Sequence, residues 1–191
     1  MGDLADRRGL ETDVYEPAED SRLLASVAVS RLADARRVLE VGTGSGYVAE
    51  RMAEETGARV IASDVNPHAC VSARERGVEA VRADLVSPFA DGAFDAVVFN
   101  PPYLPTDPDN EWDDWMERAL SGGESGREVI EAFLERVGRV LTSDGRVLLL
   151  VSSLAGVSEV VERAGEAGFS AVARADESYP FETLTVVELF Y

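Results

Sequence analysis

RVLEVGTGSG, residues 37–46, joins an apolar run to a loop of alternating glycines. The run is rich in Val and Leu and predicts a buried strand. Apolar side chains at helical spacing from Val48 to Ala53 predict a helix after the loop. Glycines let the backbone approach a ligand closely where a Cβ would clash. A strand, a glycine loop and a helix in this order form the phosphate- or nucleoside-binding turn of a Rossmann-like unit.

Two details of the sequence restrict the class of ligand that this turn could bind. Its glycines follow the spacing G-x-G-x-G rather than the dinucleotide pattern G-x-G-x-x-G, and the acid Glu40 lies within the strand just before the loop. A second strand, 59–63, ends at Asp64, where a carboxylate suits a pair of ribose hydroxyls. Asn66 then caps a helix with Pro67 at its first position. These positions favour a ligand that carries a ribose.

A third, shorter strand is predicted over 78–83 and ends at Asp84 and Leu85. A carboxylate next to an apolar side chain suits an adenine, which would be held by its amino edge and its face. A plain turn aspartate explains Asp84 equally well from the local sequence, so both interpretations stay open.

The fourth strand, 94–99, leads directly into Asn100-Pro101-Pro102-Tyr103. The two prolines prevent the strand from continuing, because they lack backbone donors and fix φ. An Asn amide, unpaired carbonyls and an aromatic ring are therefore presented at the carboxyl end of a strand, where open α/β sheets bind ligands. The alternative is a simple strand-ending turn, since Asn-Pro and Pro-Pro are frequent turn sequences.

Two further segments flank these strands. A helix is predicted over 17–32, and its first-turn acids Glu19 and Asp20 are also explained by the helix dipole. The stretch 104–127 is the one long irregular segment, and long loops in compact domains often carry function. We expect it to be a substrate-facing flap, although its tryptophans would serve equally well in local packing.

The remaining segments complete an α/β pattern. Helices are expected over 129–141 and 154–164, a fifth buried strand over 145–151, and two closing strands over 169–174 and 183–190. Five strands that alternate with helices predict a doubly wound sheet with helices on both faces. With an antiparallel closing pair, the sheet has seven mostly parallel strands. We expect one domain over 1–191, in which 1–34 holds a lead-in and the first helix.

The composition of the chain limits the kinds of protein to which it can belong. The chain has 191 residues, 46% hydrophobic content and one cysteine, Cys70, which excludes an internal disulfide and a cysteine-based zinc site. It shows no run of membrane-spanning length and no basic, apolar signal segment at its start. We therefore expect a cytoplasmic protein without a metal site of its own.

The net charge is −18, and all 18 basic residues are arginine. Such a surface resists nonspecific contact with phosphate backbones at ordinary salt, which weighs against a nucleic-acid partner. A strongly acidic, lysine-free surface is also what a halophile-like protein adapted to molar salt would carry. At 1 M salt the Debye length is about 3 Å, so the repulsion would then be largely screened.

Four motifs together resemble the class I S-adenosylmethionine-dependent methyltransferases, and in particular the HemK-type glutamine methyltransferases that modify peptide chain release factors. They are YEPAEDS at 15–21, VLEVGTGSG at 38–46, NPPY at 100–103 and ALSGGESGREV at 119–129. The first and last resemble the shorter eukaryotic and archaeal branch. The bacterial branch carries a separate amino-terminal substrate domain, for which this chain has no room.

The resemblance implies a role for each matching position. The residues implied to line the methionine part of the cofactor are Glu40, Gly42, Gly44 and Gly46. Asp64 would take the ribose hydroxyls, and Asp84 with Leu85 the adenine. Glu19, Asp20 and Ser21 would close over the amino-acid end of the cofactor; Ser21 stands where the branch more often has Thr. The catalytic corner would be Asn100, Pro101, Pro102 and Tyr103, with Asn100 and the Pro101 carbonyl accepting from the substrate amide.

The resemblance also implies a reaction and a partner. The reaction is methylation of the glutamine in the GGQ motif of a class I release factor, with S-adenosyl-L-methionine as methyl donor. The partner is a small zinc-binding activator protein that pairs along a sheet edge. Three alternatives remain: methylation of an exocyclic base amine in DNA or RNA, methylation of a protein lysine, and a cofactor-binding scaffold that has lost catalysis. The acidic charge weighs against the first of these.

Overall fold

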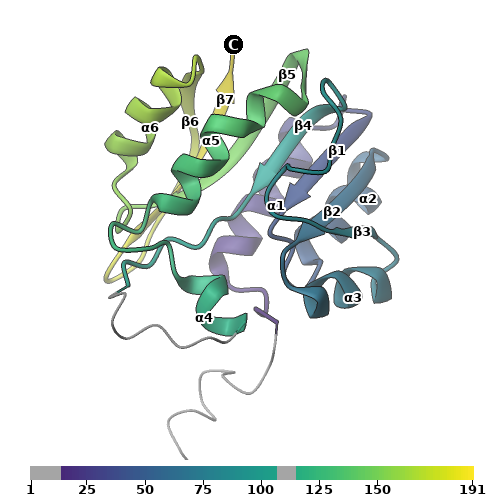
Figure 1. Ribbon diagram of the computed structural model, residues 1–191, viewed down its shortest axis with the longest axis horizontal. Coiled ribbons are helices and arrows are strands. Elements are labelled where there is room, and N and C mark those ends of the chain that lie inside the picture. The colour runs from purple at the N-terminus through teal and green to yellow at the C-terminus, as the bar shows by residue number, and fades with distance from the viewer. Residues whose placement is uncertain (1–13, 107–114) are drawn as a thin grey trace, which may run out of the picture.

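The computed structural model describes residues 14–106 and 115–191, which form one seven-stranded sheet with helices on both faces (Figure 1). The strand order is β3-β2-β1-β4-β5-β7-β6. The strands are β1 (Arg37–Val41), β2 (Arg59–Asp64), β3 (Glu79–Arg82), β4 (Phe94–Phe99), β5 (Leu141–Ser152), β6 (Ser170–Ser178) and β7 (Thr183–Phe190).

Strand direction follows the prediction. The five strands from β3 to β5 are parallel neighbours, and β7 runs antiparallel to both β5 and β6. The predicted seven-stranded, mostly parallel sheet with an antiparallel closing pair is thus confirmed. Its order reverses at β1, which pairs with β2 on one side and β4 on the other. In open α/β sheets such a switch point forms the ligand crevice at the carboxyl ends of the strands.

The helices divide between the two faces of the sheet. They are α1 (Glu19–Arg31), α2 (Tyr47–Thr56), α3 (Pro67–Glu75), α4 (Trp115–Leu120), α5 (Glu128–Val140) and α6 (Val157–Glu166). One apolar core joins α1, α2 and α3 to the sheet, and the other joins α5 and α6 to the opposite face. Helix α4 belongs to neither layer and lies beyond one end of the sheet (Figure 1). No helix of the described segments combines the length and apolar character that a bilayer span requires.

Four boundaries differ from the expectation. The stretch 104–127, expected to be irregular, contains α4. Helix α6 begins at Val157, which leaves Leu154 exposed in a turn before it. Strand β5 already begins at Leu141, which pairs with Phe94 although polar residues follow it. Strand β6 continues to Ser178, because its pairing with β7 holds a polar edge strand that has no apolar periodicity.

Candidate active site

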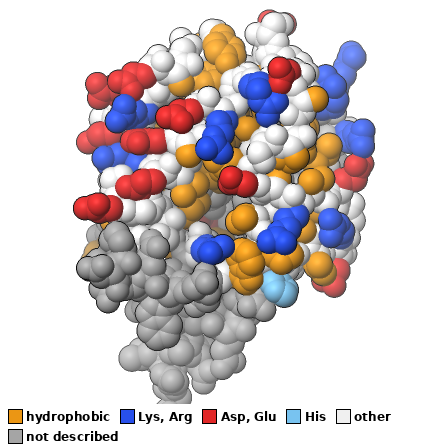
Figure 2. Space-filling view, viewed as in Figure 1, with side chains coloured by type: hydrophobic (Ala, Val, Ile, Leu, Met, Phe, Trp, Pro, Cys, Tyr) orange, Lys and Arg blue, Asp and Glu red, His pale blue; other side chains and the backbone are white. Residues whose placement is uncertain are grey.

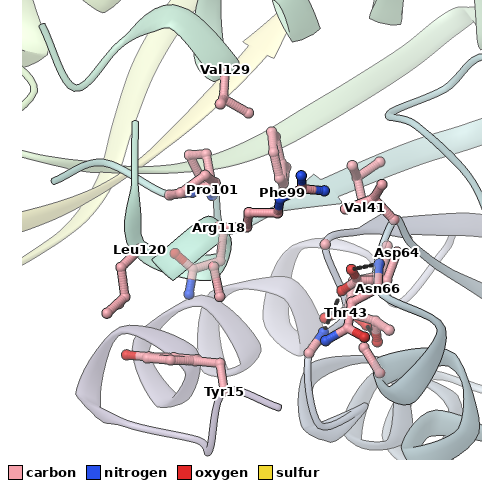
Figure 3. Close-up of a pocket in the computed structure, with 18 of the residues that line it drawn as sticks. Tyr15, Val41, Thr43, Asp64, Asn66, Phe99, Pro101, Arg118, Leu120 and Val129 are labelled. Atoms are coloured by element: carbon pink, nitrogen blue, oxygen red, sulfur yellow. Dashed lines mark hydrogen bonds between the residues drawn. The ribbon is translucent and has the colours of Figure 1, made fainter. Parts of the chain in front are cut away.

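A cavity of about 640 Å³ opens at the carboxyl ends of β1, β2 and β4. Figure 3 shows Thr43, Asp64 and Asn66 gathered on one side of it, with Pro101 and Tyr15 on the other. The cavity therefore lies at the switch point of the sheet, between the glycine loop and the corner that follows β4.

The glycine loop borders the cavity closely. Gly42 and Gly44 line it, and both have positive φ (65° and 53°). A Cβ on Gly42 would lie 3.1 Å from the Phe99 ring, so a side chain would press on the core beneath the loop. Gly46 lies outside the cavity lining, and its absent Cβ would come within 2.7 Å of Ala73 Cα on α3. The structure thus gives Gly46 a role in packing α2 against α3, and its contact with the cofactor stays a prediction.

Two carboxylates form the polar floor of the cavity. Glu40 is buried and accepts a hydrogen bond from the Thr43 hydroxyl, and burial raises the pKa of Glu40 to about 8. Asp64 accepts from the backbone N–H of Gly44 at 3.0 Å and of Asn66 at 2.8 Å. Burial also raises the pKa of Asp64, against these backbone bonds. Each Asp64 oxygen keeps a further lone pair for a ligand hydroxyl.

Asp84 and Leu85 lie along the same cavity after β3. Leu85 is half-buried and has a positive φ of 49°. The Asp84 side chain is 73% exposed, and its carboxylate lies 3.8 Å from the Arg136 guanidinium. The contact of both residues with adenine stays a prediction.

The corner after β4 is hydrogen-bonded to Asp20, a residue in the first turn of α1. The Asn100 amide nitrogen donates to the Asp20 carboxylate at 3.1 Å, and the same oxygen accepts from the Tyr15 hydroxyl at 3.1 Å. The other Asp20 oxygen accepts from the Ser21 backbone N–H at 2.5 Å. Among the described residues, the Asn100 side-chain oxygen is buried without a hydrogen-bond partner. Because a carboxylate only accepts hydrogen bonds, Asp20 fixes the amide with its free acceptor directed away.

Tyr103 completes this corner together with Pro101 and Pro102, which also line the cavity. It is half-buried. Burial and the nearby carboxylates of Asp20 and Glu182 raise the pKa of Tyr103, so its hydroxyl stays protonated at neutral pH.

The described parts of the stretch 104–127 lie against the cavity. Leu104 pairs with the end of α4: its N–H donates to Leu120 O at 3.0 Å, and its carbonyl accepts from the Gly122 N–H at 2.9 Å. Trp115 and Arg118 line the cavity, with the guanidinium 5.3 Å from the tryptophan ring centroid. Trp112 lies outside the described residues. The substrate-facing role of this stretch stays a prediction.

Most of the predicted site residues meet in this one cavity. Those that line it are Asp20, Ser21, Glu40, Gly42, Gly44, Asp64, Asp84, Leu85, Asn100, Pro101, Pro102 and Tyr103. Glu19 is exposed and, like Gly46, lies outside the lining. Sequence reasoning assigned no role to Tyr15, although it belongs to the motif 15–21, and interpreted Asn66 only as a helix cap. Arg118 and Leu120 were missed as individual residues, because only the folded chain brings α4 over the corner.

Comparison with known proteins places the chain among methyltransferases. Residues 38–123 match the family described as methyltransferase domain. The chain is 35% identical to a putative protein N5-glutamine methyltransferase of Methanocaldococcus jannaschii, over 93% of this chain and 92% of that protein. It is 32% identical to the methyltransferase HEMK2 of Homo sapiens, over 95% and 91% of the two chains. A solved structure of the E. cuniculi Mtq2-Trm112 complex, described as responsible for methylation of the eRF1 translation termination factor, matches with 31% identity and a TM-score of 0.78 over 94% of this chain and 99% of that chain.

Proposed function

Because the chain belongs to the eukaryotic and archaeal branch of the HemK-type class I methyltransferases, we propose that it methylates the glutamine in the GGQ motif of a class I peptide chain release factor. The acceptor atom is the side-chain amide nitrogen of that glutamine. The methyl donor is S-adenosyl-L-methionine.

One observation supports this acceptor above all. The Asn100 side-chain oxygen is buried and unpartnered among the described residues, at a corner where Pro101 and Tyr103 also line the cavity. A buried acceptor without a donor costs about 1–3 kcal/mol. A glutamine amide brings two N–H donors, of which one would satisfy Asn100 and the other the Pro101 carbonyl. The corner is thus complementary to an incoming amide.

Positioning accounts for the chemistry at this corner. An amide nitrogen is a poor nucleophile, because its lone pair is delocalised into the carbonyl. Two acceptors that hold both N–H groups turn one face of the nitrogen toward the methyl group. The same acceptors stabilise positive charge that develops on the nitrogen as its bond to the methyl carbon forms. S-adenosylmethionine would supply the electrophilic methyl group, whose bond to sulfur would break as the bond to nitrogen forms, and the methylated nitrogen would then release one proton.

The residues that line the cavity suit each part of S-adenosyl-L-methionine. Gly42 and Gly44 bring backbone without a Cβ to the wall of the cavity, so a ligand could approach the loop closely. Glu40 and the glycine loop would hold the methionine end, with its cationic ammonium group. Asp64 would bind the ribose hydroxyls, and Asp84 with Leu85 would border the adenine. Asp20 and Ser21 would close the amino-acid end.

We also propose a small zinc-binding activator protein as a partner. Support comes from the E. cuniculi relative, whose solved structure is a complex with Trm112. The zinc would belong to that partner and not to this chain.

Mass spectrometry of the release factor tests the proposal. The protein is incubated with S-adenosylmethionine and the release factor in high salt, with and without the activator. We expect the GGQ peptide to gain the mass of one methylene on its glutamine, and a GGN variant to gain nothing. If no condition gives this gain while the cofactor still binds, the proposed acceptor is wrong, and base amines and lysines become the acceptors to test.

A further inference from the structure

Tyr15 lies in the chain just before α1 and reaches from the glycine loop to the catalytic corner. Its backbone packs on the loop, where a Cβ on Gly44 would lie 3.4 Å from the Tyr15 carbonyl oxygen. Its half-buried ring lines the cavity (Figure 3), and its hydroxyl donates to the Asp20 carboxylate at 3.1 Å. The glycine loop therefore supports the backbone of Tyr15, and Asp20 binds its hydroxyl.

The two carboxylate oxygens of Asp20 have different partners. The first, Oδ1, accepts from the backbone N–H of Ser21 at 2.5 Å and from the Ser21 hydroxyl at 3.2 Å. The second, Oδ2, accepts from the Asn100 amide nitrogen and from the Tyr15 hydroxyl, each at 3.1 Å. Asp20 is only 5% exposed, so water has little access to these oxygens. Tyr15 thus binds the same oxygen that binds Asn100.

This shared oxygen decides which end of the Asn100 amide faces the substrate. The two ends of an amide have nearly the same shape, but one accepts hydrogen bonds and the other donates them. While Oδ2 of Asp20 stays in place it takes the nitrogen end, and the Asn100 oxygen, which is unpartnered among the described residues, is left for an incoming donor. If the carboxylate turned away, the amide could rotate, and its N–H groups would then face those of the substrate.

The Tyr15 hydroxyl remains a hydrogen-bond donor at neutral pH. Burial and, next to it, the charge of Asp20 raise the pKa of Tyr15, so the hydroxyl keeps the proton that it donates. Its bond to the carboxylate is charge-assisted, and bonds of this kind are stronger than those between neutral groups. The hydroxyl is therefore a suitable anchor for the Asp20 side chain.

We propose that Tyr15 is a positioning residue for methyl transfer, whose hydroxyl holds Asp20 in the orientation that presents the Asn100 oxygen to the substrate glutamine. This inference rests on the proposed function, since it concerns the same corner. The hydroxyl acts through Asp20 and Asn100 on the acceptor amide. Its removal should therefore lower turnover and leave cofactor binding intact.

Steady-state kinetics on the GGQ substrate tests this role. We expect Tyr15→Phe, which keeps the ring, to lower kcat about tenfold, because small misplacements at an active site reduce the rate strongly. The affinity for S-adenosylhomocysteine, measured by calorimetry, should stay at the wild-type value. Tyr179→Phe is the matched control: it removes a hydroxyl that donates to another carboxylate, Glu177, at 2.6 Å, outside the cavity lining. Its kcat should equal that of the wild type.

Hydrogen exchange of the Asn100 side-chain amide, followed by NMR, provides a readout that does not depend on activity. The signals of this amide are assigned by their absence from Asn100→Ala. In the wild type, the N–H that is bound to Asp20 should be protected from exchange with water. In Tyr15→Phe it should exchange about tenfold faster, because the carboxylate that binds it is less constrained. In Tyr179→Phe it should exchange at the wild-type rate.

Three results would each overturn the positioning role. They are a wild-type kcat in Tyr15→Phe, an unchanged exchange rate of the Asn100 amide in that variant, and a loss of turnover that saturating S-adenosylmethionine restores. Circular dichroism at the assay temperature verifies that each variant is folded. A wild-type chain that leaves GGQ unmodified overturns the proposed function instead. The exchange rates still show in that case whether Tyr15 holds Asp20 against Asn100, so the two failures are distinguishable.

Discussion

Asp20 determines which way the Asn100 amide points. Its carboxylate accepts from Asn100, Tyr15 and Ser21, and its contact with the cofactor stays a prediction. A second carboxylate at position 100 would face Asp20 at the 3.1 Å that now separates donor from acceptor. The asparagine is therefore required by its neighbour as well as by its substrate.

Two substitutions at single residues should separate catalysis from cofactor binding. Asn100→Ala removes the acceptor for the substrate amide, so methyl transfer should fall by about a hundredfold or more. Asp64→Ala removes the proposed ribose contact, so the affinity for S-adenosylhomocysteine should fall about tenfold. Calorimetry and the peptide assay measure the two quantities on both variants. Near-normal turnover in Asn100→Ala would show that the catalytic assignment is wrong.

Glu40 predicts a pH dependence of stability. Burial raises the pKa of Glu40 from 4.5 to about 8 in the folded protein. Between these values the folded state keeps a proton that the unfolded state has lost, so stability falls as pH rises and levels off above pH 8. The free energy of unfolding of the cofactor-free protein should therefore decline by about 1 kcal/mol per pH unit through this window.

Denaturant unfolding of wild type and Glu40→Gln, at a series of pH values, checks this dependence. The difference between the two proteins isolates Glu40 from other titrating groups, such as Asp64. The variant should lose most of the decline and be more stable than wild type at pH 8. Parallel curves for the two proteins would contradict the raised pKa.

At the scale of elements, the packing of α2 against α3 depends on Gly46. Its φ is 85°, and a Cβ there would meet Ala73 Cα at 2.7 Å. Gly46→Ala should lower the free energy of unfolding by about 3 kcal/mol, from backbone strain and overpacking together. Gly57 ends the same helix with a φ of 73° and open space around it, so Gly57→Ala should cost only about 1 kcal/mol. Thermal unfolding of both variants measures the difference, and equal losses would refute the packing role.

The elements differ in how far the sequence predicted them. Strands β1, β2 and β4 are short, apolar and ended by turn residues, so hydrophobic patterning located them closely. Helix α4 has only six residues. Its end is held by the backbone bond from the Leu104 N–H to the Leu120 carbonyl, and the Leu104 carbonyl accepts from the Gly122 N–H just beyond it. No local sequence pattern reveals these bonds. Strand β6 is a polar edge strand whose length is set by its pairing with β7.

The candidate site was predictable where it depends on single strands. Glu40, Asp64 and Asn100 follow from their places at the carboxyl ends of parallel strands. The hydrogen bond between Asn100 and Asp20 joins residues that lie 80 positions apart in the chain. It depends on how α1 docks on the sheet, so periodicity and spacing did not predict it.

At the scale of the molecule, 36 acidic residues outnumber 18 arginines, which leaves a net charge of −18 even where arginines pair with carboxylates. Figure 2 shows acidic and arginine side chains side by side on the face that carries α5 and α6. There Arg163 pairs with Glu131 at 3.4 Å and with Glu166 at 2.8 Å. Exposed pairs of this kind contribute about 0–1 kcal/mol each, so the excess negative charge still repels itself.

The thermal midpoint should therefore rise with ionic strength. From 0.1 M to 1 M salt the Debye length shrinks from about 10 Å to about 3 Å, which screens repulsion between surface carboxylates. Scanning calorimetry in sodium chloride measures the shift. Chloride is the appropriate salt, because sulfate also strengthens the burial of apolar surface. A constant or falling midpoint would show that self-repulsion does not limit stability.

The position of β7 in the sheet affects how the sheet can form while the ribosome synthesises the chain from its N-terminus. Strand β7 lies between β5 and β6, although β6 precedes it in the chain. While the chain grows on the ribosome, β6 has no neighbour to pair with until β7 has emerged from the exit tunnel. The free edge of β5 waits for the same strand, because β7 pairs with both β5 and β6. The last three strands of the sheet therefore cannot join one by one in the order of the chain, and they come together only once β7 has been synthesised.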